Sequence, residues 1–136
     1  MRTPDRNGKR VRPKDASTLI VVRRGGKPRI LMGKRAPTNL FMPNKFVFPG
    51  GGLELCDQRL KVTQELNFHV IKRLRKGTSK RFSSERVKGL ALAAIRETYE
   101  ETGLIIGHKT REKFVTANKV WQSYFSYGVE PPLDQL

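Results

Sequence analysis

The chain has 136 residues, 37% of them hydrophobic, which suits one core of ordinary size and a single domain. It carries 28 Lys and Arg against 12 Asp and Glu, a formal net charge of +16, and its one cysteine, Cys56, excludes an internal disulfide. No apolar run approaches the roughly 18 to 20 residues of a membrane-spanning helix, and the basic N-terminus lacks the apolar stretch of a secretory signal. These features predict a cytoplasmic protein that does not bind membranes and attracts polyanions.

The first elements are an arm and a pair of strands. Residues 1–15 are polar and basic and are expected to form a flexible arm, which leaves 16–136 as the domain. A run rich in β-branched residues at 17–24 and a second run at 29–36 predict two strands joined by a turn at 25–28.

The middle of the chain predicts a short strand and a helix. Segment 45–54 reads as a strand that ends in the triple glycine Gly50–Gly52. From there on, apolar residues recur every four positions and predict one buried helical face: Val62, Leu66, Val70 and Leu74. Phe68 and Phe82 are interpreted as core residues, and residues 77–80 end this helix.

A second helix is predicted from Ser83 or Ser84 to Thr102, because either serine can cap its start and Gly103 is a typical C-terminal stop. Its buried stripe is expected to consist of Leu92, Ile95 and Tyr99. Segment 104–107 then begins another strand, residues 113–128 predict an extended stretch with a turn at 117–119, and the last residues read as a loop.

Three glutamates gather on another side of this second helix: Glu97, Glu100 and Glu101, spaced i, i+3 and i+4. Like charges at this spacing repel one another by a few tenths of a kcal/mol per pair. Arg96 neutralises one of them, and a divalent cation such as Mg²⁺ neutralises two and prefers such hard oxygen ligands. A solvated acidic face is the other reading of the same pattern.

The segment Arg96 to Leu104 resembles the second half of the Nudix box, R-E-U-x-E-E-x-G-U with U apolar. Gly51 and Asp57 resemble its first half, with Asp in place of the usual Glu, and Thr98 replaces an apolar residue. Residues 58–95 separate the two halves, many more than in an uninterrupted box, so we assign 58–90 as a basic helical insertion. Interrupted boxes of this kind occur in a Nudix branch that includes coenzyme A diphosphatases.

The resemblance implies an α/β fold of the Nudix type, an α/β/α sandwich with a mixed sheet. Nudix relatives continue well beyond the box, whereas 32 residues follow Leu104 here. The fold is therefore expected to be incomplete at the C-terminus. An exposed sheet edge would then recruit a partner, such as a second copy in a homodimer.

The activity implied by the resemblance is Mg²⁺- or Mn²⁺-dependent hydrolysis of a nucleoside diphosphate linked to another moiety. The resemblance assigns the metal to Glu97, Glu100 and Glu101. Arg96 would orient Glu97 or a neighbouring glutamate, and either Glu100 or Glu101 would act as general base. Gly50 and Gly51 would shape the turn that meets the helix, and Gly50–Gly52 would allow the backbone to come close to a phosphate or to the helix that carries the glutamates.

The segment Leu31 to Gly51 has the spacing of the segment that precedes the box in coenzyme A diphosphatases, although Leu40 and Asn44 stand where that pattern has Arg and Gly. This favours coenzyme A or an acyl derivative as substrate, with Arg35 on a phosphate. ADP-ribose, dinucleotides, nucleotide sugars and oxidised nucleoside triphosphates remain open. A different class of function also remains: a truncated, inactive scaffold whose basic surface binds nucleic acid or another polyanion.

Overall fold

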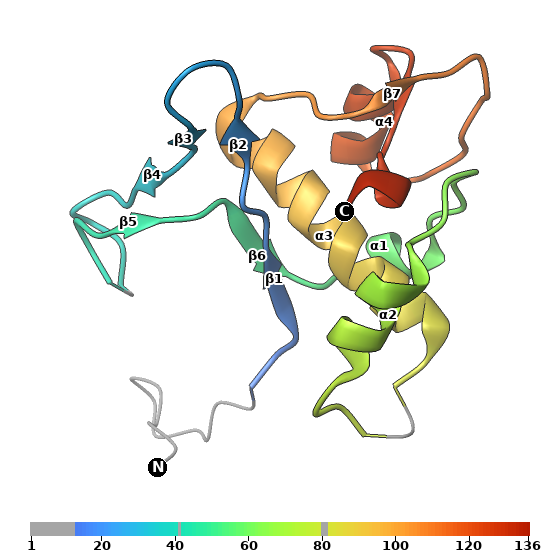
Figure 1. The fold of residues 1–136 in the computed structure, drawn as a ribbon, viewed down its shortest axis with the longest axis horizontal. Helices are drawn as coiled ribbons and strands as arrows, with labels where there is room; N and C mark the ends of the chain where they lie inside the picture. The colour runs from blue at the N-terminus through green and yellow to red at the C-terminus, as the bar shows by residue number, and fades with distance from the viewer. Residues whose placement is uncertain (1–12, 41, 80–81) are drawn as a thin grey trace.

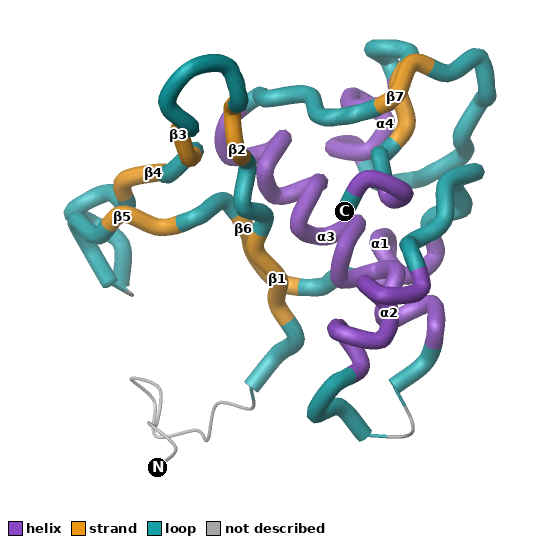
Figure 2. Tube along the Cα trace, in the orientation of Figure 1, coloured by secondary structure: helices purple, strands orange, loops and turns teal. Residues whose placement is uncertain are grey.

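The computed structural model describes residues 13–40, 42–79 and 82–136. Its centre is the long helix α3 (Ser84–Thr102), which Figure 1 shows crossing the molecule diagonally. The strand pair β1 (Ala16–Thr18) and β6 (Gly50–Gly52) packs against one side of α3, and α4 (Lys119–Phe125) packs against it elsewhere. Figure 2 shows the helices gathered on one side and most strands on the other, which confirms the α/β class.

The strands form four two-stranded antiparallel sheets in the part of the chain that the structure describes. Besides β1–β6, the pairs are β2 (Val22–Arg23) with β3 (Arg29–Ile30), β4 (Gly33–Lys34) with β5 (Phe46–Val47), and β7 (His108–Lys109) with β8 (Val129–Glu130). The expected mixed sheet is therefore not formed among these residues. Each strand run breaks after two or three residues, so each piece has hydrogen bonds to only one neighbour.

The predicted strands at 17–24 and 29–36 are each divided in two. The turn between them is confirmed, because Val22 pairs with Ile30 and Arg23 with Arg29. The earlier part of the first run turns away as β1 and pairs with β6 instead.

The triple glycine is a strand, so the prediction that Gly50 and Gly51 form a turn is wrong. Thr18 lies opposite Gly50 and Ser17 opposite Gly51. A Cβ on Gly50 would lie 2.3 Å from the carbonyl oxygen of Ser17, and one on Gly51 would lie 2.4 Å from Cδ of Glu97. Glycine is needed here because β6 is squeezed between β1 and α3, which confirms the predicted close approach to the helix.

The predicted helix from Val62 begins later. Helix α2 (Phe68–Arg75) starts after Asn67, whose side chain accepts a hydrogen bond from the backbone N–H of His69 at 2.9 Å. Leu66 is buried although it lies in an irregular segment. Phe68 is 71% exposed and is not the core residue that its sequence context suggests.

A short helix, α1 (Leu55–Arg59), was not predicted. It follows β6 directly and packs closely on α3. Gly89 of α3 permits this approach, since a Cβ there would already lie 3.0 Å from side-chain atoms of Leu53 and Gln58. This contact places the first half of the box beside the helix that carries the second half.

Helix α3 has the predicted bounds. The hydroxyl of Ser83 accepts a hydrogen bond from the N–H of Arg86 at 3.2 Å, and Gly103 ends the helix in the left-handed region with φ 70°. Leu92 and Ile95 are buried as expected. The helix is continuous from Ser84 to Thr102, so the end of the insertion and the second half of the box share one rigid element.

The extended stretch predicted at 113–128 is wrong, since residues 119–125 form α4. The side chain of Asn118 caps this helix by accepting a hydrogen bond from the N–H of Trp121 at 3.0 Å. Trp121 and Tyr124 are fully buried. The chain end predicted as a loop contains β8 and a 3₁₀ turn, η1 (Leu133–Gln135), and it buries Leu133 completely.

Most of the predicted arm, residues 1–12, lies outside the described residues. Asp15 belongs to the folded body, because its carboxylate forms an ion pair with Arg86 and its carbonyl accepts a hydrogen bond from the N–H of Leu53 at 2.9 Å. Among the described residues, no helix is both long and apolar enough to cross a membrane.

Candidate active site

A buried ion pair joins the two halves of the box. Arg96 Nε donates to Asp57 Oδ1 at 2.9 Å, and Arg96 Nη2 donates to Asp57 Oδ2 at 3.1 Å. The side chain of Asp57 is fully buried, and that of Arg96 is 2% exposed. The 38 residues that separate the two positions in sequence therefore do not separate them in space.

Asp57 also binds groups from α1 and α4. Its Oδ2 accepts from the backbone N–H of Glu54 at 3.0 Å, and its Oδ1 accepts from the indole N–H of Trp121 at 3.0 Å. The carboxylate thus connects α1, α3 and α4, and the shorter Asp reaches Arg96 without difficulty. The sequence analysis did not identify Trp121 as a partner of Asp57. The available signal was that the indole N–H of a buried tryptophan needs a hydrogen-bond acceptor.

Arg96 also binds two glutamates of the second half of the box and the backbone of β6. Nη1 donates to Glu97 at 2.9 Å and to Glu100 at 3.2 Å, while Nη2 donates to the carbonyl oxygen of Gly52 at 3.0 Å. Burial lowers the pKa of Arg96, but the hydrogen bond and charge of Asp57, together with Glu97, outweigh it and raise this pKa overall. Arg96 therefore stays charged and fixes Glu97 and Glu100, as its predicted orienting role requires.

The glutamates lie against strand β6. The carboxylate of Glu97 occupies the space where a side chain on Gly51 would lie, and Glu101 Oε2 accepts from the N–H of Gly50 at 3.3 Å. Glu97 is largely buried, whereas half of the Glu100 side chain is exposed. The three carboxylates supply hard oxygen donors beside a strand backbone. Their carboxylate groups do not gather closely enough to form a ready metal site, since the described residues contain no group of three side chains that could hold a metal ion.

Burial raises the pKa of Glu97, and the charges of Glu100 and Glu101 raise it further against the opposing effect of Arg96. A carboxyl group whose pKa is higher in the folded state than in the unfolded state loses its proton more easily when the chain unfolds. The free energy of unfolding therefore falls as the pH rises through this range. Ionised Glu97 therefore costs stability above its raised pKa, and this cost vanishes below the ordinary carboxyl range.

Glu97→Gln, which mimics the protonated acid, should consequently unfold at a higher urea concentration than the parent at pH 7. The advantage should shrink at pH 4, measured by urea denaturation of both proteins at the two pH values. An advantage that is equal at both pH values, or larger at pH 4, would contradict this account of Glu97.

A cleft of 380 Å³ opens between the β4–β5 hairpin and the end of α3. Arg35 and Lys34 line it from the hairpin, and Glu101 lines it from the helix. The backbone of Arg35 is fixed in place, since its N–H donates to Lys45 at 3.0 Å and its carbonyl accepts from Asn44 at 3.1 Å. The structure thus brings Arg35, the residue predicted to bind a substrate phosphate, and Glu101, one of the predicted catalytic glutamates, to the same cleft.

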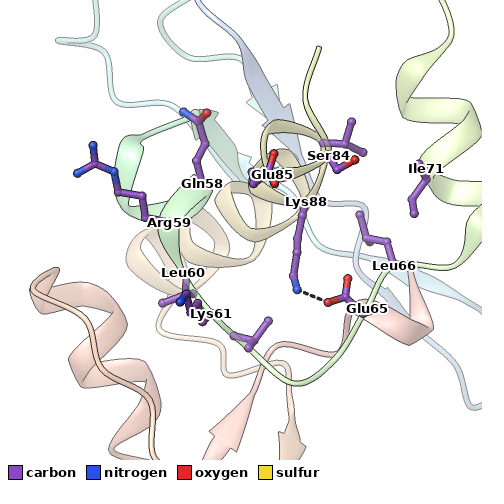
Figure 3. A pocket seen from close by; sticks show the side chains of 12 residues that line it. Gln58, Arg59, Leu60, Lys61, Glu65, Leu66, Ile71, Ser84, Glu85 and Lys88 are labelled. Atoms are coloured by element: carbon purple, nitrogen blue, oxygen red, sulfur yellow. Dashed lines mark hydrogen bonds and ion pairs between the residues drawn. The ribbon is translucent and has the colours of Figure 1, made fainter. Parts of the chain in front are cut away.

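A larger cavity, of 780 Å³, lies elsewhere and includes none of the box glutamates. Figure 3 shows it between the insertion and the first turns of α3, with an ion pair of 2.7 Å between Lys88 and Glu65 across it. Its floor is apolar, with Leu66 from the insertion and Val87 from α3. We place the candidate active site at the smaller cleft, because that cleft is lined by Arg35 and Glu101, two of the predicted site residues.

Comparisons with known proteins found similarity to an acyl-coenzyme A diphosphatase and to a NUDIX hydrolase. No protein-family model matches the chain. The acyl-coenzyme A diphosphatase NUDT19 of Xenopus laevis is 30% identical over 95 residues, which cover 57% of this chain and 25% of that protein. The chain thus spans about a quarter of the length of this curated relative.

A solved structure has the same fold. It is a NUDIX hydrolase from Alicyclobacillus acidocaldarius, with a TM-score of 0.56 and 21% sequence identity, and the match covers 89% of this chain and 57% of that one. The likeness to this structure shows that the chain has the fold of a NUDIX hydrolase, and the interrupted box, rejoined by the Asp57–Arg96 ion pair, is similar to the Nudix box.

Proposed function

We propose that this protein hydrolyses the diphosphate bond of a nucleotide linked to another moiety, with Mg²⁺ or Mn²⁺. The observation that carries the proposal is the Asp57–Arg96 pair, which reassembles the interrupted box and leaves Glu97 and Glu100 hydrogen-bonded to Arg96.

The donor set fits a hard divalent cation in its chemistry. Glu97, Glu100 and Glu101 are the residues that would hold it, after side-chain adjustment on the partly exposed Glu100. A bound cation of this kind lowers the pKa of coordinated water and polarises a phosphate oxygen. Arg96 keeps Glu97 and Glu100 oriented, and Glu100 or Glu101 would accept the proton of the attacking water.

Coenzyme A or an acyl-coenzyme A is the substrate that we favour. One support is the similarity to a protein named an acyl-coenzyme A diphosphatase. Another is Asn44, which replaces a glycine of the coenzyme A diphosphatase pattern and has a φ of 60°. Asparagine tolerates this left-handed conformation better than most residues, so the departure preserves the loop. Arg35 would bind a substrate phosphate in the cleft.

The test is Mg²⁺-dependent turnover on a panel of coenzyme A, acyl-coenzyme A, ADP-ribose, NADH and 8-oxo-dGTP. We expect coenzyme A compounds to be hydrolysed fastest. Glu100→Gln with Glu101→Gln should lower kcat/KM by roughly a hundredfold or more, as when an electrostatic group of a catalytic site is removed. Glu112→Gln, at an exposed position outside the box, is the matched control. No turnover of any compound by the folded parent would refute the proposal.

Binding of a polyanion is a second candidate, and helix α2 favours it. The helix carries Lys72, Arg73 and Arg75 with no acidic residue, and the ring of Phe68 is exposed beside them. This function predicts RNA affinity that falls steeply with salt and survives the double glutamine substitution. Undetectable RNA binding at low salt would eliminate it.

A further inference from the structure

The β2–β3 hairpin concentrates positive charge at one point. Arg23 lies directly opposite Arg29, on the face of the hairpin away from Val22 and Ile30. Like charges in directly opposed positions destabilise a strand pair. None of the ion pairs formed by the described residues includes Arg23, Arg29 or the nearby Lys27. The repulsion is therefore not offset by a carboxylate of this part of the chain.

These cations line a small cavity. It has a volume of 150 Å³ and is lined by Arg23, Lys27, Arg29 and the backbone of Gly25. All three side chains are exposed to solvent, and every charged group in the lining is positive. Two arginine forks and an ammonium group around a cavity of this size are the chemistry that recognises a phosphate dianion. Such an anion would also remove the repulsion between the paired arginines.

The hairpin is close to the proposed active site along the chain. Strand β4 follows β3 after two residues, and Arg35, next to β4, lines the cleft that contains Glu101. At no more than about 3.6 Å per extended residue, Arg29 lies within roughly 22 Å of Arg35. A nucleotide that binds at both places must therefore have its two phosphorylated positions within that distance.

We infer that the hairpin cavity binds a phosphate monoester of the substrate, separate from the diphosphate that is cleaved. This inference rests on the proposed function and narrows its substrate class to nucleotides that carry an additional phosphate on the ribose. Coenzyme A has such a 3′-phosphate, whereas ADP-ribose and NADH lack it. The hairpin would therefore determine specificity without taking part in bond cleavage.

The test is a binding measurement by calorimetry with two probes, adenosine 3′,5′-bisphosphate and adenosine 5′-phosphate. The parent should bind the bisphosphate roughly tenfold more tightly, the effect of a few charge-assisted hydrogen bonds. Arg23→Gln with Arg29→Gln should bring the ratio of the two affinities close to one. The matched control, Arg111→Gln with Lys113→Gln at two exposed positions, removes the same charge and should keep the parent ratio.

Lys27→Gln provides a second variant in the exposed turn and should lower the ratio severalfold even if the double variant does not fold. A parent ratio near one, or an unchanged ratio in both hairpin variants, would overturn the inference. Because binding is measured without turnover, the two proposals fail separately. Loss of hydrolysis with the ratios as expected would refute the proposed reaction only, and active protein with unchanged ratios would refute the hairpin site only.

Discussion

Replacing Arg96 by methionine should lower the free energy of unfolding by about 3–5 kcal/mol, the cost of removing one partner of a buried ion pair. The substitution leaves Asp57 fully buried, with the N–H groups of Glu54 and Trp121 and the weakly donating thiol of Cys56 as its partners among the described residues. It also releases Glu97 and Glu100, so activity should fall together with stability. Urea denaturation at pH 7 measures the first effect.

A double substitution separates the buried charge from the lost packing. Asp57→Asn with Arg96→Met removes both charges, so it should be more stable than Arg96→Met alone. If Arg96→Met instead unfolds at the same urea concentration as the parent, the ion pair does not join the box in the way described.

Gly51→Ala should reduce kcat/KM by roughly a hundredfold while changing stability much less. The new Cβ would lie 2.4 Å from Cδ of Glu97, whose carboxylate must then move away from Arg96. Moving the end of a flexible side chain costs little folding energy, but a misplaced group near the reacting atoms costs much in rate. Steady-state kinetics with Mg²⁺ and coenzyme A, combined with urea denaturation, separates the two effects.

Gly52→Ala is the matched control, because a Cβ at Gly52 would meet nothing within 4 Å. It places the same methyl group one residue further along the same strand and should retain nearly full activity. Equal losses in the two variants would mean that the strand and not the position of Glu97 controls the rate.

Local signals predicted the helix that carries the site. A serine cap at Ser83 and a glycine stop at Gly103 each act within a few residues, so the bounds of α3 followed from the sequence. The spacing of Glu97, Glu100 and Glu101 on that helix followed for the same reason. Their roles were implied by the resemblance to the box and remain proposals.

Spacing alone failed where tertiary contacts decide. Val62 and Leu66 match a helical period, but an irregular segment before Asn67 buries Leu66 equally well. The aromatic residues around Trp121 are typical of a strand, yet Trp121 and Tyr124 bury the same face of a helix capped by Asn118. In both segments the packing against α3 outweighs local preference.

The links within the site were also beyond local reasoning. The indole N–H of Trp121 donates to Asp57 across 64 sequence positions. Arg35 and Glu101 line the same cleft although they are far apart in the chain. The close approach of Gly51 to α3 was predicted from the absence of a side chain. The sequence placed the triple glycine at the end of a strand and assigned a turn to Gly50 and Gly51, since glycine is typical of turns, but it did not indicate the pairing of these glycines with β1.

The rejoined box is proposed to bind a divalent cation, and a Mn²⁺ titration measures this binding without any substrate. Titration followed by the electron paramagnetic resonance of free Mn²⁺ counts the ions that the protein binds. We predict a Mn²⁺ site in the parent that is lost in Glu100→Gln with Glu101→Gln and retained in Glu112→Gln. Unchanged Mn²⁺ binding in the double variant, or no binding by the folded parent, would contradict the account.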